Sequence, residues 1–221
     1  GVEEVRLQGG KGDGMRLLQV RNGRGLEFTV SADRCADISR LIFRGENCGF
    51  FSANGYVAPA YYDDKEDGWL KNFTAGFLTT CGLTYMGSYC TDEGKALGQH
   101  GLISNVPANH VGSAVRCEGD TPSIQVSGQI KQAQVFGEHL VMSRVIRLDV
   151  ERNVFTIEDE IENRGLTRTP YMILYHMNYG YPMLNEGCVV EAPGGAVAGR
   201  DQHAQNGLHK WMQMELPADD M

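Results

Sequence analysis

The chain has 221 residues, of which 42% are hydrophobic and 22% charged, so residues 1–221 can bury the core of one domain. The formal net charge of −8 argues against the basic surface that non-specific nucleic-acid binding needs. No apolar run approaches the roughly 20 residues of a membrane span, and no signal-peptide pattern opens the chain. We therefore expect a cytoplasmic protein that binds neither nucleic acid nor membrane.

The six cysteines are scattered, and no two form a CxxC pair. In a chain of this size, this pattern favours reduced, buried thiols over a disulfide framework or a zinc knuckle. The cysteines are Cys35, Cys48, Cys81, Cys90, Cys117 and Cys188.

Short alternating runs separated by turn residues open the chain. Residues 15–21 and 26–30 flank Asn22-Gly23, which predicts a β-hairpin, and residues 39–43 predict the next strand. Between these strands, Arg34 and Asp37 directly follow an apolar run. Arg34 could hydrogen-bond a polyol or an anionic substituent, or it could pair with Asp37 to fix a turn.

A loop-like segment follows at residues 52–71, and it carries Trp69 and an acidic run that we interpret as solvated. Residues 73–85 are apolar and rich in small residues, which predicts a bent strand. Residues 86–112 hold few strand signals and predict a long functional loop. Within it, His100 lies between glycines, where a backbone can approach a ligand closely.

The second half of the chain is more regular. Three alternating runs predict consecutive antiparallel strands, and Asp159 shares the inward row of the third with Phe155, Ile157 and Ile161. A shorter strand and a loop-rich tail are expected near the end. The strands are expected at residues 123–135, 139–150, 154–162 and 187–192, with the tail from residue 193.

Residues 170–182, PYMILYHMNYGYP, predict a strand that is apolar on both faces and therefore buried on both sides. His176 and Asn178 share one face at its end, which suggests the rim of a small-molecule site. A core histidine bound to a backbone carbonyl is an equally good interpretation. Together the runs predict a mainly antiparallel all-β fold, a large sandwich.

His100 and His176 are the histidines that the context singles out, since the other four lie in polar loops or at strand ends. A histidine pair suits proton transfer to and from a hydroxyl or ring oxygen. Aromatic rings such as those of Trp69 and Tyr181 could face the CH groups of a sugar, although aromatic residues more often lie in a core. His100, His176 and Glu186 could hold a metal ion, but no metal-ligand spacing supports such a site. Phosphate-loop and dinucleotide motifs are also missing from the sequence.

Four stretches resemble a known superfamily. GLEFTVSADRCADISRLIFRG, FTAGFLTTCGLTYMG, GQHGLISNVPA and YMILYHMNYGYPML together resemble an uncharacterised bacterial branch of the aldose 1-epimerase (galactose mutarotase)-like superfamily. The resemblance runs over nearly the whole chain and implies a β-supersandwich with a carbohydrate site. It implies that His100 positions the sugar, that His176 with Asn178 protonates the ring oxygen, and that Arg34 is the nearest candidate for the arginine that contacts hydroxyls.

The chain departs from this superfamily at its C-terminal end. The resemblance implies a glutamate general base in a later part of the domain, which this sequence does not contain, so we expect an incomplete sandwich. Asp159, Glu186 and Glu191 are nearby carboxylates without a matching motif. An incomplete sandwich exposes a strand edge, which predicts a homo-oligomer that covers it.

Three functions remain open. The first is an aldose 1-epimerase-like enzyme that needs no cofactor, because each step moves only protons. The second is a non-catalytic module that binds a sugar. The third is another sugar isomerase or lyase on the same fold, since a fold does not fix a function. The candidate site residues common to these functions are His100, His176, Arg34, Asp37, Asn178, Tyr181 and Trp69.

Overall fold

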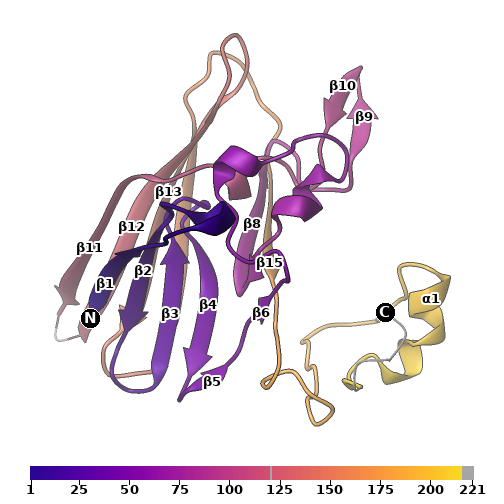
Figure 1. The fold of residues 1–221 in the computed structure, drawn as a ribbon. Coiled ribbons are helices and arrows are strands. Elements are labelled where there is room, and N and C mark those ends of the chain that lie inside the picture. Colours follow the sequence, from indigo (N-terminus) through magenta and orange to yellow (C-terminus); the bar gives the residue numbers. More distant parts are fainter. Residues whose placement is uncertain (120, 216–221) are drawn as a thin grey trace.

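Two antiparallel sheets packed face to face form the body of the protein in a computed structural model that describes residues 1–119 and 121–215 (Figure 1). Residue 120 and residues 216–221, which the expected domain includes, lie outside this description. The first sheet has the order β1 (Val2–Arg6), β2 (Arg16–Arg21), β3 (Leu26–Ser31), β4 (Asp37–Phe43) and β5 (Glu46–Asn47). The second has the order β11 (Asn109–Glu118), β12 (Thr121–Ala133), β13 (His139–Asp149) and β14 (Phe155–Asn163).

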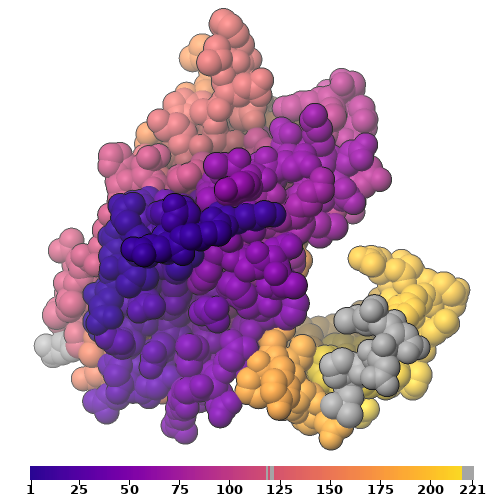
Figure 2. Space-filling model, in the orientation of Figure 1, coloured from indigo at the N-terminus to yellow at the C-terminus, as the bar shows by residue number. Residues whose placement is uncertain are grey.

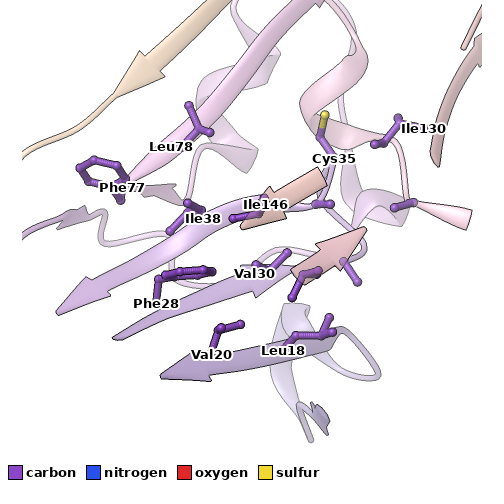
Figure 3. Packing of buried hydrophobic residues seen from close by; sticks show 14 of the residues in the cluster. Leu18, Val20, Phe28, Val30, Cys35, Ile38, Phe77, Leu78, Ile130 and Ile146 are labelled. Carbon is purple, nitrogen blue, oxygen red and sulfur yellow. The ribbon is translucent and has the colours of Figure 1, made fainter. Parts of the chain in front are cut away.

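The core lies between these two sheets. Alternate residues of β2 and β3 point inward, and they meet the inward residues of β12 and β13. Figure 3 shows Phe28 and Val30 from one sheet near Ile146 from the other. The rings of Phe28 and Phe155 join the layers at a centroid distance of 5.3 Å. Burial of this many branched side chains supplies the main driving force for folding.

A third pair of strands stands beside the sandwich. β8 (Leu78–Leu83) pairs antiparallel with β15 (Met172–Met177), so that His176 lies opposite Thr79. The segment that precedes β8 contains β6 (Phe50–Phe51), β7 (Ala75–Gly76) and the 3-10 helices η2 (Pro59–Tyr61) and η3 (Gly68–Asn72). After β8, β9 (Cys90–Asp92) and β10 (Lys95–Leu97) form a projecting hairpin, and η4 (Ile103–Asn105) leads into β11 (Figure 1).

The C-terminal segment contains no sheet strand within its described residues. The strand expected at residues 187–192 is wrong, because only an isolated bridge joins Val189 to Gln213. A short helix, α1 (Gln202–Asn206), and the 3-10 helix η5 (Leu208–Lys210) follow instead. Asp201 caps α1 by accepting a hydrogen bond from the Ala204 backbone N–H. In Figure 2 these yellow residues stand apart from the main body.

The strands with strong alternation are confirmed, and several weaker ones went unpredicted, among them β1, β11 and the short β9–β10 hairpin. β1 has the sequence VEEVR, whose central charges hide its strand character, and β11 begins inside the segment expected to be one long loop. The expected burial of β15 on both faces is also wrong. Within the described residues β15 pairs only with β8, and Leu174, Tyr175 and Met177 are each more than a third exposed. No described helix has the length and apolar character to cross a membrane.

All six thiols are free, but only half match the expectation of burial. Cys35, Cys48 and Cys81 are buried, whereas Cys90 and Cys117 are exposed. Burial raises the pKa of the Cys81 thiol to about 12, which suppresses the reactive thiolate at neutral pH.

Thiol labelling tests this placement directly. In native protein at pH 8, we expect Cys90 and Cys117 to react rapidly with an aromatic disulfide reagent, and the three buried thiols to react only after denaturation. Mass spectrometry of the labelled peptides identifies each site. Rapid native labelling of Cys81 would contradict the fold.

We propose that a second copy of the chain covers the open edge of β15, since one exposed strand pairs readily with an identical one around a twofold axis. Light scattering after size exclusion should give twice the 24.3 kDa mass of one chain. Met177→Lys should restore the single-chain mass, whereas Val135→Lys, at an exposed apolar position outside β15, should not. A wild-type protein that stays at 24.3 kDa at all concentrations contradicts this proposal.

Candidate functional site

The fold brings His100 and His176 together from distant parts of the chain. His100 lies in the loop between β10 and η4, and His176 lies near the end of β15. Their ring centroids are 5.7 Å apart with an interplanar angle of 74°. Both side chains are half-buried, so the two rings meet near the surface beside β8.

Two aromatic rings support this pair. The ring of Trp69, from η3, stacks on Phe73 at a centroid distance of 4.4 Å and meets His100 edge-on at 4.5 Å. The ring of Phe73 meets His176 edge-on at 5.6 Å. We call Trp69, Phe73, His100 and His176 the four-ring cluster. Edge-to-face contacts at these distances favour one arrangement of the rings.

Trp69 supports the cluster from within the protein. Its side chain is only 2% exposed, and its indole Nε1 donates to Ser104 Oγ at 3.1 Å. The expectation that Trp69 offers its ring to a sugar is therefore wrong, because its faces are covered by protein. Tyr181 lies on the loop after β15 and is 78% exposed, and no described contact joins its ring to the cluster.

The backbone around His100 is tightly constrained. His100 has a φ of 59°, and its Nδ1 lies 2.9 Å from the carbonyl oxygen of Met86. Because a carbonyl only accepts, the neutral ring carries its proton on Nδ1 and leaves the Nε2 lone pair available. A Cβ at Gly101 would lie 2.3 Å from the Gly82 carbonyl oxygen, so this position requires glycine.

The backbone of β15 positions His176, whose side chain has ring contacts but no hydrogen bond through Nδ1. Its Nδ1 is buried and makes no hydrogen bond with any described residue. Asn178 donates from Nδ2 to the carbonyl oxygen of His176 at 3.1 Å, and its backbone N–H donates to Phe77 at 2.9 Å. Asn178 therefore lies beside His176 as expected, and its side-chain amide fixes the end of β15.

Arg34 and Asp37 do not form a pair, and neither is open to a ligand. Arg34 is buried and donates to three backbone carbonyls, and the adjoining cavity of about 20 Å³ has room for one water but not for a sugar. Cys35 and Ala36, between them, have φ values of 56° and 50°, and this left-handed turn separates the two side chains. The expectations that Arg34 and Asp37 contact a sugar, or form an ion pair together, are therefore wrong.

Asp37 instead belongs to a buried network centred on Arg144, which sequence reasoning missed. Arg144 Nη1 donates to Asp37 at 2.6 Å, and its Nε and Nη2 donate to the two oxygens of Asp159 at 2.8 Å each. Thr80 donates to Asp37 through both its backbone N–H and its hydroxyl. Burial alone would lower the pKa of Arg144, but the hydrogen bond to Asp159 and the neighbouring negative charges raise it above its ordinary value.

This network reaches the strand that carries His176. The Tyr175 hydroxyl donates to Asp159 at 2.8 Å, and burial together with this hydrogen bond raises the pKa of the tyrosine. Two signals could have revealed the network, because Arg144 and Asp159 both lie in inward-facing apolar rows, where each charge needs a buried partner.

A groove lies near the start of β15, and its lining contains no member of the four-ring cluster. It has a volume of about 690 Å³ and lies between the β9–β10 hairpin, the turn at Glu138 and residues 167–170. It reaches Leu97, three residues before His100, and Met172 at the start of β15.

Glu186 and Glu191 are exposed. Within residues 1–119 and 121–215, no group of three or more His, Cys, Asp or Glu side chains is arranged to hold a metal ion.

The Arg144 network predicts a large stability effect at Asp37. Asp37→Asn preserves the shape but leaves buried Arg144 with one carboxylate fewer, which should lower the free energy of unfolding by about 3–5 kcal/mol. Urea denaturation measures this loss. As a matched control, Asp63→Asn removes the carboxylate from the exposed pair with Lys71 and should change stability far less. Equal effects of the two substitutions would contradict the role of the network.

Two solved structures share this fold. A proposed aldose 1-epimerase from Klebsiella pneumoniae subsp. pneumoniae MGH 78578 is 27% identical with a TM-score of 0.90, and the match covers 99% of this chain and 58% of that one. A galactose 1-epimerase from Lactobacillus acidophilus NCFM is 14% identical with a TM-score of 0.51, over 81% of this chain and 53% of that one. The chain thus spans little more than half the length of either.

These likenesses agree with the mainly antiparallel architecture and with the superfamily that the motifs resemble. No curated protein matches the chain. A family model, described as a domain of unknown function (DUF4432), matches residues 12–221. The chain therefore belongs to the DUF4432 family, an uncharacterised branch with the aldose 1-epimerase fold.

Proposed function

We propose that this protein binds a sugar and interconverts its anomers by general acid–base catalysis, as an aldose 1-epimerase does. The observation that carries the proposal is the contact of His100 with His176, two rings from separate segments placed 5.7 Å apart. The Nε2 of each ring makes no hydrogen bond with a described residue, so both atoms are available to a ligand. The likeness to the proposed Klebsiella epimerase supports the same reaction class.

In this mechanism the two histidines act at different oxygens. His100, fixed through Nδ1 by the Met86 carbonyl, directs Nε2 to a sugar hydroxyl and orients the ring. His176 gives a proton to the ring oxygen while a base removes the proton of the anomeric hydroxyl. The C1–O5 bond then breaks and the aldehyde forms. Rotation about C1–C2, followed by the reverse proton transfers, closes the other anomer.

A second function, a non-catalytic sugar-binding module, is favoured because the described carboxylates near the site do not hydrogen-bond the histidines. Among the described residues no carboxylate hydrogen-bonds either imidazole, and both oxygens of Asp159 are already bound by Arg144. None of these hydrogen bonds therefore identifies a carboxylate that could act as the general base. A module with this site would hold a sugar between the histidines without moving its protons.

Exchange spectroscopy by NMR separates the two functions. In a panel of aldoses and uronic acids, we expect saturation transfer between the α and β signals of at least one sugar. His176→Asn should slow this exchange by about 100-fold or more, because it removes the general acid, and should leave line broadening on binding intact. His203→Asn, at an exposed histidine of α1, serves as the control and should exchange at the wild-type rate.

Binding without exchange in the wild-type protein would select the module. Undiminished exchange in His176→Asn would overturn the assignment of the acid. A pure sugar anomer, followed by polarimetry, gives an independent rate for the same three proteins.

A further inference from the structure

Arg34 lies beneath the segments that carry the four-ring cluster. Arg34 follows β3 and is only 7% exposed to solvent. Its guanidinium donates three hydrogen bonds to backbone carbonyls. Nε donates to Ser104 at 2.6 Å, and Nη1 donates to Val57 at 2.9 Å and to Asn72 at 3.0 Å. One side chain therefore ties together three loop segments that are far apart in sequence.

Two of these segments hold the cluster. Asn72 ends η3, which contains Trp69 and leads directly into Phe73. Ser104 lies in η4, four residues after His100, and its hydroxyl accepts the Trp69 indole hydrogen bond at 3.1 Å. Arg34 thus fixes the backbone on both sides of the contact between Trp69 and His100, whose rings are 4.5 Å apart.

The chemistry of this position requires arginine. A guanidinium is planar and presents several donors in fixed directions, so it can reach carbonyls in three directions at once. A lysine ammonium is a single strongly hydrated point charge and would satisfy fewer of these acceptors when buried. Burial lowers the pKa of Arg34 to about 10, which still leaves the side chain charged at neutral pH.

We propose that Arg34 is a positioning residue, which sets the placement of His100 by holding η3 and η4 against β3. This inference rests on the proposed function for its catalytic consequence, but the geometry it asserts can be measured without any sugar. It gives Arg34 a role distinct from contact with the substrate, since the adjoining cavity of about 20 Å³ cannot admit a sugar ring.

The geometric test follows ring signals by NMR in the full chain. Arg34→Lys should shift the Trp69 indole N–H and the His100 ring signals and speed exchange of that indole proton, while the signals of exposed His203 stay in place. Trp211→Phe assigns the two indole signals. Arg16→Lys is the matched control, because Arg16 hydrogen-bonds Asp33 and the Ala108 carbonyl and makes no hydrogen bond with a described residue of η3 or η4. It should leave the Trp69 and His100 signals unchanged.

The kinetic test uses the sugar that shows anomer exchange. Misplacing a reacting group by about 1 Å costs up to roughly 100-fold in rate. Arg34→Lys should therefore lower kcat by about 10- to 100-fold while KM changes less than about threefold. A substitution that merely destabilised the protein would lower the active fraction in proportion to unfolding, which thermal denaturation measures separately.

The outcomes are distinct. A folded Arg34→Lys protein with unmoved Trp69 and His100 signals overturns the proposal. If that variant does not fold, Arg34→Gln decides, because its side-chain amide offers fewer donors and cannot reach all three carbonyls at once. Moved Trp69 and His100 signals in folded Arg34→Gln support the proposal, and unmoved signals overturn it. A wild-type protein without anomer exchange overturns the proposed function, while the ring signals still decide the role of Arg34.

Discussion

The buried charge of Arg144 is the constraint on which the arrangement of the strands depends. Its guanidinium, fully excluded from solvent, binds Asp37 at the start of β4, Thr80 in β8 and Asp159 in β14, and Asp159 binds Tyr175 in β15. Four strands and β13 itself therefore converge on one cation. Each acceptor must stay in place, because an unpaired buried charge is costly. We infer that this network specifies the relative position of the β8–β15 pair and the sandwich.

Two buried arginines stabilise different parts of the candidate site. Arg144 fixes strands through side-chain acceptors, so it acts on β15 and hence on His176. Arg34 binds the backbone carbonyls of Val57, of Asn72 in η3 and of Ser104 in η4, so it acts on the segments around His100. Loops that carry functional residues are otherwise the least constrained parts of a fold. The histidine pair thus combines one residue from a strand with one from an anchored loop.

The sequence predicts those features that arise from local periodicity. Alternation and the Asn22-Gly23 turn locate β2, β3 and β12–β14, and the glycines around His100 with the strand-end position of His176 identify both members of the pair. Partners across the core are different, because they depend on tertiary geometry. Arg144 shares the inward row of β13 with Leu140, Met142, Ile146 and Leu148, so alternation predicts its burial, but alternation does not predict that Asp159 is its partner.

The wrong expectations for Arg34, Asp37 and residues 170–182 have the same origin. Arg34 and Asp37 are close in the chain, but two left-handed residues turn their side chains toward different partners. Residues 170–182 have the apolar content of a buried strand, yet β15 has β8 as its single described neighbour. Apolar content predicts that a strand needs a cover, and it does not predict which segment supplies it.

The pairing of β8 with β15 also bears on how the protein folds. Met172 lies opposite Leu83, so this pairing closes a loop that contains the whole β11–β14 sheet. Contacts of such long sequence separation carry a large loop-closure entropy and form slowly, after the local hairpins. His100 and His176 meet only once that closure is complete. During synthesis, the β1–β5 meander can therefore fold long before the ribosome has delivered the strand that assembles the site.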